Sequence, residues 1–368
     1  MHVLLVEPRY YTQHPPLGLL KLAAYHRQLG DTVELVRNGW GFVCKPPHLI
    51  YVTSLFTYAW KPVHEAVRFY RVAFPKVPII LGGIYATLMP EHAELSGADE
   101  VRTGLVEEVE DLLPDYSLVP ECKASVLFAS RGCIRRCPFC AVPMMEPVLK
   151  ARTSIASLIC PGHGKVILWD NNFLGTPYWR DVVGELKELN LRLDFNQGLD
   201  ARLITEEVAR HLRGLRIYPI RMAYDVPQER RAVARAIGTL ELVGFHKRDM
   251  IVYTLYNFRE SPDEFLDRLR DLLEWGVVAY PMRFEPLDSL EKNKHIGPRW
   301  SAERLDMVAR ARRVIGYGGA FPPYEGLKRK FLDARSFEEA FGLRGPRERR
   351  SGRNSQEEVE SYPLLPVG

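Results

Sequence analysis

The sequence lacks the features that would place the protein in a membrane, in a secretory pathway or on nucleic acid. No apolar run approaches the roughly 20 residues that a helix needs to cross a bilayer. The opening residues, MHVLLVEPRYY, have neither the charged start nor the long apolar stretch of a secretion signal. The 50 basic side chains barely exceed the 46 acidic ones, so nucleic acid is not the expected partner. We therefore expect a cytoplasmic protein with no membrane partner.

Cysteine is also scarce, with six residues in a chain of 368. This number is too low for a disulfide scaffold, and a reducing compartment would keep the cysteines as thiols. Cys44, Cys122 and Cys160 are isolated in the sequence. The other three cysteines, at positions 133, 137 and 140, stand close together, and this clustering is the most informative feature of the chain.

Residues 1–113 alternate between strand and helix patterns. Continuous apolar runs predict five buried strands, at residues 2–7, 32–36, 49–54, 78–81 and 100–103. Helical spacing of apolar residues occurs between them, at 17–29, 64–74 and 107–113. The alternation predicts the α/β class, with a doubly wound, Rossmann-like sheet that binds ligands beyond the carboxyl ends of its strands.

A linker is expected at residues 114–123, after which the alternation resumes over residues 124–300. Strands are predicted at 125–130, 166–170, 192–197, 220–225, 250–257 and 277–284. Helices are predicted at 178–189, 205–215, 228–243 and 262–275. Six such units indicate a partial, TIM-like (β/α)6 barrel rather than a second open sheet. Residues 301–368 are expected to form a C-terminal helix, at 302–315, and a tail that is polar and basic over 344–353.

The clustered cysteines stand in the segment RGCIRRCPFCAVP, residues 131–143, with the spacing C-x3-C-x2-C. Three thiolates in one loop can ligate three irons of a cubane and leave the fourth open, whereas electron-transfer cubanes use four cysteines. A zinc site usually needs a second cysteine pair, and the sequence has none. The alternatives are a structural metal knuckle or three unrelated cysteines. The predicted strand directly before the loop favours the cluster.

With Phe139 just before the third cysteine, this motif resembles the signature of the radical S-adenosylmethionine (SAM) superfamily. The resemblance implies that the loop follows the first strand of the barrel and that Cys133, Cys137 and Cys140 hold a [4Fe–4S] cluster. It also implies that SAM binds the open iron. One electron, from a donor such as flavodoxin or ferredoxin, then cleaves SAM to methionine and a 5′-deoxyadenosyl radical.

Polar residues at the carboxyl ends of the barrel strands are candidates for holding SAM. By the resemblance, an aromatic residue lies near the adenine, a polar group after the second strand meets the methionine amine, and later strands reach the ribose or the carboxylate. The predicted SAM contacts are Phe139, Asp170, Asn172, Gln197, Arg202 and Tyr224, with Arg221 and Asp225 as further candidates. The alternative for Asp170 and Asp225 is that they cap the helices that follow.

The amino-terminal part resembles the cobalamin-binding domain that precedes the barrel in one branch of this superfamily. The resemblance rests on PPLGLLKLAAYHRQLG (15–30), TSL (53–55), LGGIYATLMPE (81–91) and RTGLVEE (102–108). The predicted cobalamin contacts are Thr53, Ser54, Leu55, Gly82, Gly83, Ile84, Tyr85 and Gly104. The D-x-H-x-x-G motif that supplies a cobalt ligand in many cobalamin enzymes is absent, and His14 is interpreted as an ordinary loop histidine. A vestigial domain that binds no corrinoid is the alternative.

If both cofactors bind, the resemblance implies radical C-methylation of an unactivated carbon, with methylcobalamin as the methyl donor. The substrate is then a peptide or protein, such as methyl-coenzyme M reductase, or a small molecule. Candidate substrate contacts on the last two strands are Tyr253, Tyr256, Arg259, Tyr280, Arg283 and Glu285. The alternative is a radical SAM enzyme that performs cyclisation, epimerisation or sulfur insertion and keeps a vestigial cobalamin domain. A nucleic-acid-binding tail is disfavoured because Glu357 and Glu358 follow the basic run.

Overall fold

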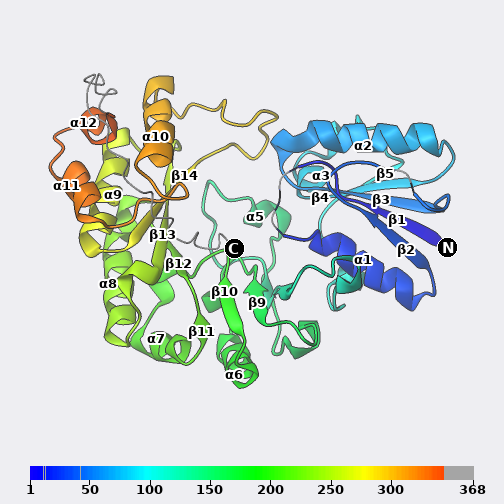
Figure 1. The fold of residues 1–368 in the computed structure, drawn as a ribbon, viewed down its shortest axis with the longest axis horizontal. Helices are drawn as coiled ribbons and strands as arrows, with labels where there is room; N and C mark the ends of the chain where they lie inside the picture. The colour runs from blue at the N-terminus through cyan, green and yellow to red at the C-terminus, as the bar shows by residue number, and fades with distance from the viewer. Residues whose placement is uncertain (11, 13, 42, 344–368) are drawn as a thin grey trace, which may run out of the picture.

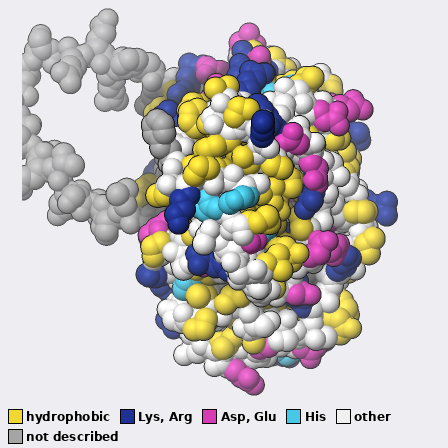
Figure 2. Space-filling view, turned by 90° about the vertical axis from the view of Figure 1, so that its right-hand side faces the viewer, with side chains coloured by type: hydrophobic (Ala, Val, Ile, Leu, Met, Phe, Trp, Pro, Cys, Tyr) yellow, Lys and Arg dark blue, Asp and Glu magenta, His cyan; other side chains and the backbone are white. Residues whose placement is uncertain are grey.

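The computed structural model describes residues 1–10, 12, 14–41 and 43–343 (Figure 1). The predicted tail over residues 344–368 lies outside the described residues. Among the described residues, no helix is long and apolar enough to cross a membrane. On the face shown in Figure 2, basic and acidic side chains are interspersed among apolar ones.

The amino-terminal part is a five-stranded parallel sheet, which confirms the predicted alternation. Its strands are β1 (His2–Val6), β2 (Thr32–Val36), β3 (Leu49–Ser54), β4 (Ile79–Gly83) and β5 (Glu100–Arg102). They lie in the order β2-β1-β3-β4-β5. This order reverses between β1 and β3, so the expected ligand crevice lies beyond the carboxyl ends of these strands.

Helices cover both faces of this sheet (Figure 1). They are α1 (Leu17–Gln28), α2 (Trp60–Ala73), α3 (Ile84–Leu88) and α4 (Pro90–Glu94). Because side chains alternate along a strand, β1 presents Val3 and Leu5 to α1, while Leu4 and Val6 join the core under α2. The helix predicted at 107–113 is wrong: the chain forms only a 3-10 turn, η2 (Glu107–Val109), and the following Pro114 disfavours helical backbone before it.

The second half also alternates strands and helices as predicted. Its strands are β6 (Ala124–Leu127), β9 (Lys165–Leu168), β10 (Arg192–Phe195), β11 (Arg216–Ile217), β12 (Ile220–Ala223), β13 (Met250–Tyr256) and β14 (Val278–Arg283). They form two parallel sheets, β11-β10-β9-β6 and β12-β13-β14, which a parallel bridge between Leu199 and Met222 joins. No pairing links β14 to β6 among the described residues, so the strand array has an open side.

Four helices pack on the outer face of this array: α6 (Trp179–Leu189), α7 (Glu206–Arg213), α8 (Arg230–Leu242) and α9 (Pro262–Trp275). The last begins at a capping box, in which the Ser261 hydroxyl accepts from the amide of Glu264 and the Glu264 carboxylate accepts from the amide of Ser261. Gly276, in the left-handed conformation, ends it. The remaining single turns are η1 (Thr57–Ala59), η3 (Tyr116–Leu118), η4 (Ala156–Leu158), η5 (Phe173–Gly175), η6 (Ala201–Leu203), η7 (Pro227–Glu229) and η8 (Lys247–Asp249).

The C-terminal region contains three helices where the sequence predicts one. The predicted helix is α10 (Ala302–Val314), and two short helices follow it, α11 (Glu325–Leu332) and α12 (Phe337–Phe341). Their aromatic side chains, Phe331 and Phe341, are fully buried in the same core as α9. Residues 301–343 are therefore packed onto the second strand array.

The carboxyl ends of the two strand arrays face the same space between them (Figure 1). There α3 lies against α5 (Val142–Met145), a short helix that follows the cysteine loop. On one side, Thr57 Oγ1 donates to the carbonyl of Ser289 at 2.7 Å, and Trp60 Nε1 donates to that of Leu290 at 3.2 Å. These contacts tie the amino-terminal sheet to the loop after β14.

Candidate functional site

The cysteine loop begins just after β6 and is closed by a two-stranded antiparallel ribbon. The ribbon pairs β7 (Ser130–Arg131) with β8 (Lys150–Ala151). Gly132 follows at φ +77°, and a Cβ there would lie 2.5 Å from the carbonyl oxygen of Val148. Glycine is therefore required where the two ends of the loop approach each other. The sequence predicts the strand before the loop but not this ribbon.

The three cysteines are half-buried and lie on irregular backbone within this loop. Burial raises the pKa of the Cys137 thiol, and the Cys140 and Cys133 sulfurs raise it further. Burial and Cys133 likewise raise the pKa of Cys140. Three neighbouring thiolates therefore disfavour one another unless a cation shares their charge. This donor set suits iron, which thiolates bind after losing their protons.

The other cysteines do not join this set. Cys122 and Cys160 pack beside Tyr116 in a separate apolar cluster, and Cys44 is exposed. In the described part of the chain, no group of three or more His, Cys, Asp or Glu side chains is arranged to hold a metal ion. The structure therefore contains no preformed single-ion site at the cysteines. A cubane takes one cysteine on each of three irons, so its ligands need not converge on one point.

Glu146 stabilises the cysteine loop through hydrogen bonds inside it. Its side chain is 6 % exposed and accepts from the Gly132 amide at 2.7 Å, from Arg131 Nη1 at 3.1 Å and from Asn171 Nδ2 at 2.9 Å. Three hydrogen bonds, one of them charge-assisted, fix the path of the chain into and out of the loop. The sequence gives no motif that distinguishes Glu146 from other glutamates.

Asp170 and Asn172, predicted to hold SAM, lie directly beneath the loop. Asp170 is buried and accepts from the Ala129 amide at 3.0 Å and from Ser130 Oγ at 2.7 Å. Burial raises its pKa to about 6, although these hydrogen bonds oppose the shift. Asn172 Oδ1 accepts from the Gly175 amide at 3.1 Å and so caps η5. Both side chains have structural partners, and a role in binding SAM stays a prediction.

Asp200 joins the loop to the strand ends. It accepts from Arg135 Nε at 3.0 Å, from Asn172 Nδ2 at 3.2 Å and from Arg202 Nε at 2.7 Å. Arg202 also pairs with Glu229 at 3.1 Å and lowers the pKa of Cys137, which places it beside the cysteine loop. Arg202 is among the residues that the sequence predicts, whereas Asp200, two residues away in NQGLDARL, is not.

The structure does not bring all the predicted SAM residues together. Phe139 packs edge-on against Phe258 at 5.8 Å between ring centroids, whereas Gln197 is exposed and contacts its neighbour Asn196. The Tyr224 hydroxyl donates to Asp271 on α9, on the outer, helix-covered face. Because strand residues alternate in direction, Asp225 points the other way, and its charge raises the pKa of Cys140. The Tyr224 side chain therefore lies among the helices, and its contact with SAM stays a prediction.

Seven of the eight predicted cobalamin residues lie at the carboxyl ends of β3 and β4, and the eighth, Gly104, follows β5. Ser54 Oγ donates to the Gly82 carbonyl at 2.7 Å and accepts from the Ala86 amide at 3.2 Å. At Gly83, φ is +104° and a Cβ would lie 2.1 Å from the Ser54 carbonyl oxygen. The approach that requires glycine at 83 is therefore to the β3 backbone. This packing requires glycine at 83 whether or not a ligand binds there.

The remaining cobalamin candidates differ in what their side chains and backbone contact. Tyr85 is buried, and its hydroxyl lies 2.9 Å from His64 Nε2 and 2.6 Å from His92 Nδ1. The amide of Gly104 donates to Thr87 Oγ1 at 3.0 Å. Three candidates are half-buried and lie on or beside the ends of β3 and β4; they are Thr53, Leu55 and Ile84. Gly82 is half-buried as well, and Gly83 and Gly104 are exposed, so of the set only Ser54 and Tyr85 are too buried for a ligand contact.

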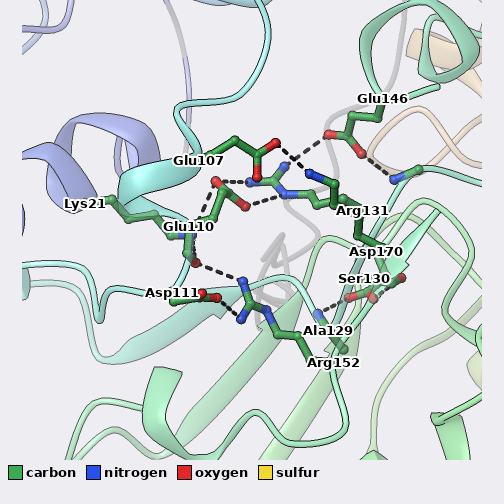
Figure 3. A network of polar contacts seen from close by, with 12 residues as sticks. Lys21, Glu107, Glu110, Asp111, Ala129, Ser130, Arg131, Glu146, Arg152 and Asp170 are labelled. Carbon is green, nitrogen blue, oxygen red and sulfur yellow. Dashed lines mark hydrogen bonds and ion pairs between the residues drawn. The ribbon is translucent and has the colours of Figure 1, made fainter. Parts of the chain in front are cut away.

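An ionic network ties the amino-terminal sheet to the cysteine loop (Figure 3). Glu110, just after η2, accepts from Arg131 Nε at 2.8 Å and Nη2 at 2.9 Å. Lys21 on α1 and Arg152 after β8 both donate to the Glu110 carbonyl, at 2.7 and 3.0 Å. Arg152 also pairs with Asp111. All five of these residues carry charged side chains and they come from both halves of the chain, so the two halves meet within two residues of Cys133.

Comparison with known proteins gives one informative likeness. No protein-family model and no curated protein matches the chain. A solved structure of TsrM, a radical SAM methyltransferase from Kitasatospora setae with cobalamin and a [4Fe–4S] cluster bound, aligns with a TM-score of 0.59 and 16% identity. The alignment covers 78% of this chain and 77% of that one. The chain shares this fold. At such low identity the likeness speaks for the fold alone.

A second solved structure, the radical SAM coproporphyrinogen III oxidase HemN from Escherichia coli, aligns at 13% identity over 58% of this chain and 60% of that one. Its TM-score of 0.35 is too low to support an argument.

Proposed function

We propose that the protein is a radical SAM enzyme that holds a [4Fe–4S] cluster at Cys133, Cys137 and Cys140. The observation that carries the proposal is the three-cysteine loop at the carboxyl end of β6, in a chain that shares the TsrM fold. The raised pKa values of the Cys137 and Cys140 thiols also support it, because these groups need a cation to stabilise them as thiolates. A fourth cysteine is not part of this group among the described residues.

When bound, the reduced cluster supplies the electron that cleaves SAM to methionine and a 5′-deoxyadenosyl radical, for which flavodoxin or ferredoxin is the proposed donor. The chain's own residues hold the cysteine loop in place and orient the groups around it. Arg202 places a positive charge beside Cys137 and is itself fixed by Asp200. Arg135, also fixed by Asp200, restrains the loop between the first two cysteines. Phe139 and Phe258 provide an apolar wall that would exclude water from the reacting carbon.

Within this class, we propose radical C-methylation with cobalamin at the carboxyl ends of β3 and β4. Support comes from the position of these ends opposite the cysteine loop, with α3 against α5, and from the extent of the likeness to TsrM, which covers most of both chains. The residues that would line the corrinoid are Thr53, Leu55 and Ile84, which are half-buried. The methylated substrate is a peptide, a protein such as methyl-coenzyme M reductase, or a small molecule.

One observation favours a second candidate, a radical SAM enzyme of another reaction type with a vestigial cobalamin domain. Ser54 and Tyr85 already have hydrogen-bonding partners within the chain, and Gly83 is needed for packing against Ser54. These three features would persist in a domain that binds no corrinoid. Cyclisation, epimerisation and sulfur insertion are the reactions this candidate includes.

The deciding experiment is anaerobic production with iron, sulfide and hydroxocobalamin, followed by an ultraviolet–visible spectrum and analysis for iron and cobalt. About four irons and one cobalt per chain support the methylase, and about four irons without cobalt support the second candidate. Cys137→Ala is expected to abolish the cluster and all SAM cleavage. Cys44→Ala is the matched control, since Cys44 is exposed and isolated. A Cys137→Ala protein that still cleaves SAM would refute both candidates.

A further inference from the structure

A basic groove opens beside the carboxyl ends of β13 and β14. It has a volume of about 940 Å³ and lies between residues 292–296, one side of α10 and the glycine-rich turn at 316–319. That volume is in the range of small-molecule sites and is too small for a folded partner. The groove lies outside the cysteine loop and the predicted cobalamin crevice.

The groove carries an excess of positive charge. Five of its lining side chains are basic: Arg283, Lys292, Lys294, Arg312 and Arg313. One is acidic, Asp306, and it already pairs with Arg310 at 2.8 Å. Among the described residues, Lys294 and Arg313 have no hydrogen bond or ion pair. Arg283 is paired with Glu285 at 3.6 Å, so Lys294 and Arg313 are the cations without a counter-charge in the described part of the chain, and such cations in a concavity raise the local concentration of anions.

The two inner arginines are held in place by backbone oxygens. Arg283 Nη2 donates to the carbonyls of Asn293 at 3.0 Å and His295 at 2.8 Å, and its Nε pairs with the Glu285 carboxylate at 3.6 Å. Arg312 Nε donates to the Gly319 carbonyl at 2.8 Å. A Cβ at Gly319 would lie 2.7 Å from Arg312 Nη2. The glycine turn therefore lets this guanidinium stay against the groove wall, with N–H groups left to bind a planar oxyanion.

Arg312 also hydrogen-bonds the hydroxyl of Tyr256, a buried residue that lines the groove, and the charge of Arg283 acts on the same hydroxyl. Burial raises the pKa of Tyr256, while Arg312 and Arg283 act in the opposite direction. A polar hydroxyl and two guanidinium groups thus converge at the inner end of the groove. This arrangement matches a carboxylate or phosphate group better than a neutral ligand.

We infer that this groove binds the anionic end of the substrate, a small organic molecule that carries carboxylate or phosphate groups. The inference rests on the proposed function, because it assigns the groove to that reaction. Two lines of contacts join the groove to the rest of the site. Along the rim, ring contacts link His295 to Phe284, Phe258 and Phe139 of the cysteine loop.

On the concave face of the strands, Arg312 lies 5.2 Å from the ring of Tyr280, which packs on Tyr253 at 5.4 Å. Tyr253 accepts in turn from Arg221 Nε at 3.1 Å. An anchored anion therefore leaves the rest of the molecule to extend over the concave face toward the cysteine loop. This division separates the binding group from the carbon that reacts.

The test is isothermal titration calorimetry of the full-length protein with pyrophosphate and with citrate, at low and at near-physiological salt. The variant is Lys294→Gln/Arg313→Gln, because neither side chain has a bond that the fold needs. Its matched control is Arg231→Gln/Arg235→Gln, which removes the same charge from exposed positions of α8. We expect the first double variant to weaken probe binding about tenfold or more and the control to leave it within about twofold. Preference for pyrophosphate or for citrate identifies phosphate or carboxylate as the natural group.

Equal weakening in both double variants, or no weakening in either, would overturn the inference, because binding would then depend on net charge or on another part of the chain. Absence of probe binding by the unaltered protein would overturn it as well. These results are independent of the cluster: iron content and SAM cleavage are measured on the same protein preparation. If the protein holds the cluster and cleaves SAM but does not bind either probe, the inference about the groove is wrong and the proposed function stands. Probe binding without a cluster leaves an anion site but removes its assignment to a radical reaction.

Discussion

Arg131 holds Glu110 through two parallel hydrogen bonds, from Nε at 2.8 Å and Nη2 at 2.9 Å, and both side chains are less than one-sixth exposed. The pair connects the end of η2, which follows β5 of the amino-terminal sheet, to Arg131, which stands two residues before Cys133. The same guanidinium lies over the ring of Phe128 at 3.4 Å and donates to Glu146 inside the loop. One side chain thus couples the position of the amino-terminal part to the geometry of the cysteine loop.

Replacing Arg131 tests this coupling. Arg131→Ala leaves Glu110 and Glu146 without their main partner and is expected to cost about 3 kcal/mol, because a buried charge loses its counter-charge. Arg131→Lys is expected to cost less, about 1–2 kcal/mol, since an ammonium cannot form the two-pronged contact. Denaturant unfolding and proteolysis within residues 114–123 would report the loss. Arg210→Ala, which breaks an exposed pair with Glu206, should cost less than about 1 kcal/mol; a similar loss there would contradict the argument.

Gly132→Ala tests the closure of the cysteine loop. The added Cβ would meet the Val148 carbonyl at 2.5 Å on backbone at φ +77°, so the ribbon must shift, at a cost of about 2 kcal/mol or more. We expect less iron and acid-labile sulfide per chain after anaerobic reconstitution. Gly162→Ala is the control, because Gly162 has φ +85° with no atom within 4 Å of the added Cβ. Unchanged cluster content in Gly132→Ala would show that the loop tolerates a different closure.

The strands were predictable because their apolar runs are continuous, as in β1, where all five residues are buried. The cysteine loop was predictable from spacing alone, since three thiols in eight residues have few other uses. The residues that form hydrogen bonds to this loop were not predictable from the sequence. Glu146 and Asp200 act through hydrogen bonds to residues 14 and 65 positions away in the chain, and nothing local to either residue marks that role.

The sequence is least informative where a shift of one residue along a strand reverses the direction of a side chain. Tyr224 and Asp225 follow β12 directly, and because successive residues of an extended chain point to opposite sides, the sequence does not show which of the two faces the cysteine loop. At Gly83 the sequence shows a glycine after a strand but does not show that the backbone of Ser54 lies against it. The helices α11 and α12 were missed because eight and five residues give too short a pattern to recognise.

Gly83→Ala distinguishes packing from ligand binding in the amino-terminal part. A Cβ at 2.1 Å from the Ser54 carbonyl oxygen is expected to separate β4 from β3 and lower the thermal unfolding midpoint by several degrees, for a cost of about 2–3 kcal/mol. Gly82→Ala places its Cβ at an ordinary 3.6 Å from the Arg102 carbonyl oxygen and should leave the midpoint nearly unchanged. If the two variants unfold alike, the close approach at Gly83 does not stabilise the sheet.

Acid should weaken the amino-terminal part through His64. This imidazole is buried on α2 between the Tyr85 hydroxyl, His92 on α4 and the ring of Trp60, and burial, followed by the charges of His92 and Arg68, lowers its pKa from 6.5 to about 4. Between these values the unfolded chain binds a proton that the folded chain does not. Stability contributed by neutral His64 is therefore complete above about pH 6.5 and falls as the pH drops toward 4.

The loss should approach roughly 3 kcal/mol at the acid end, from a shift of this size. Denaturant midpoints at pH 7, 6 and 5 would measure it, and His64→Gln should flatten that pH dependence. His211→Gln serves as the control, because His211 is exposed on α7 and contacts the backbone of its own helix. A pH dependence that persists in His64→Gln would mean that acid acts on another group. A dependence lost equally in His211→Gln would mean that burial of the imidazole is not its cause.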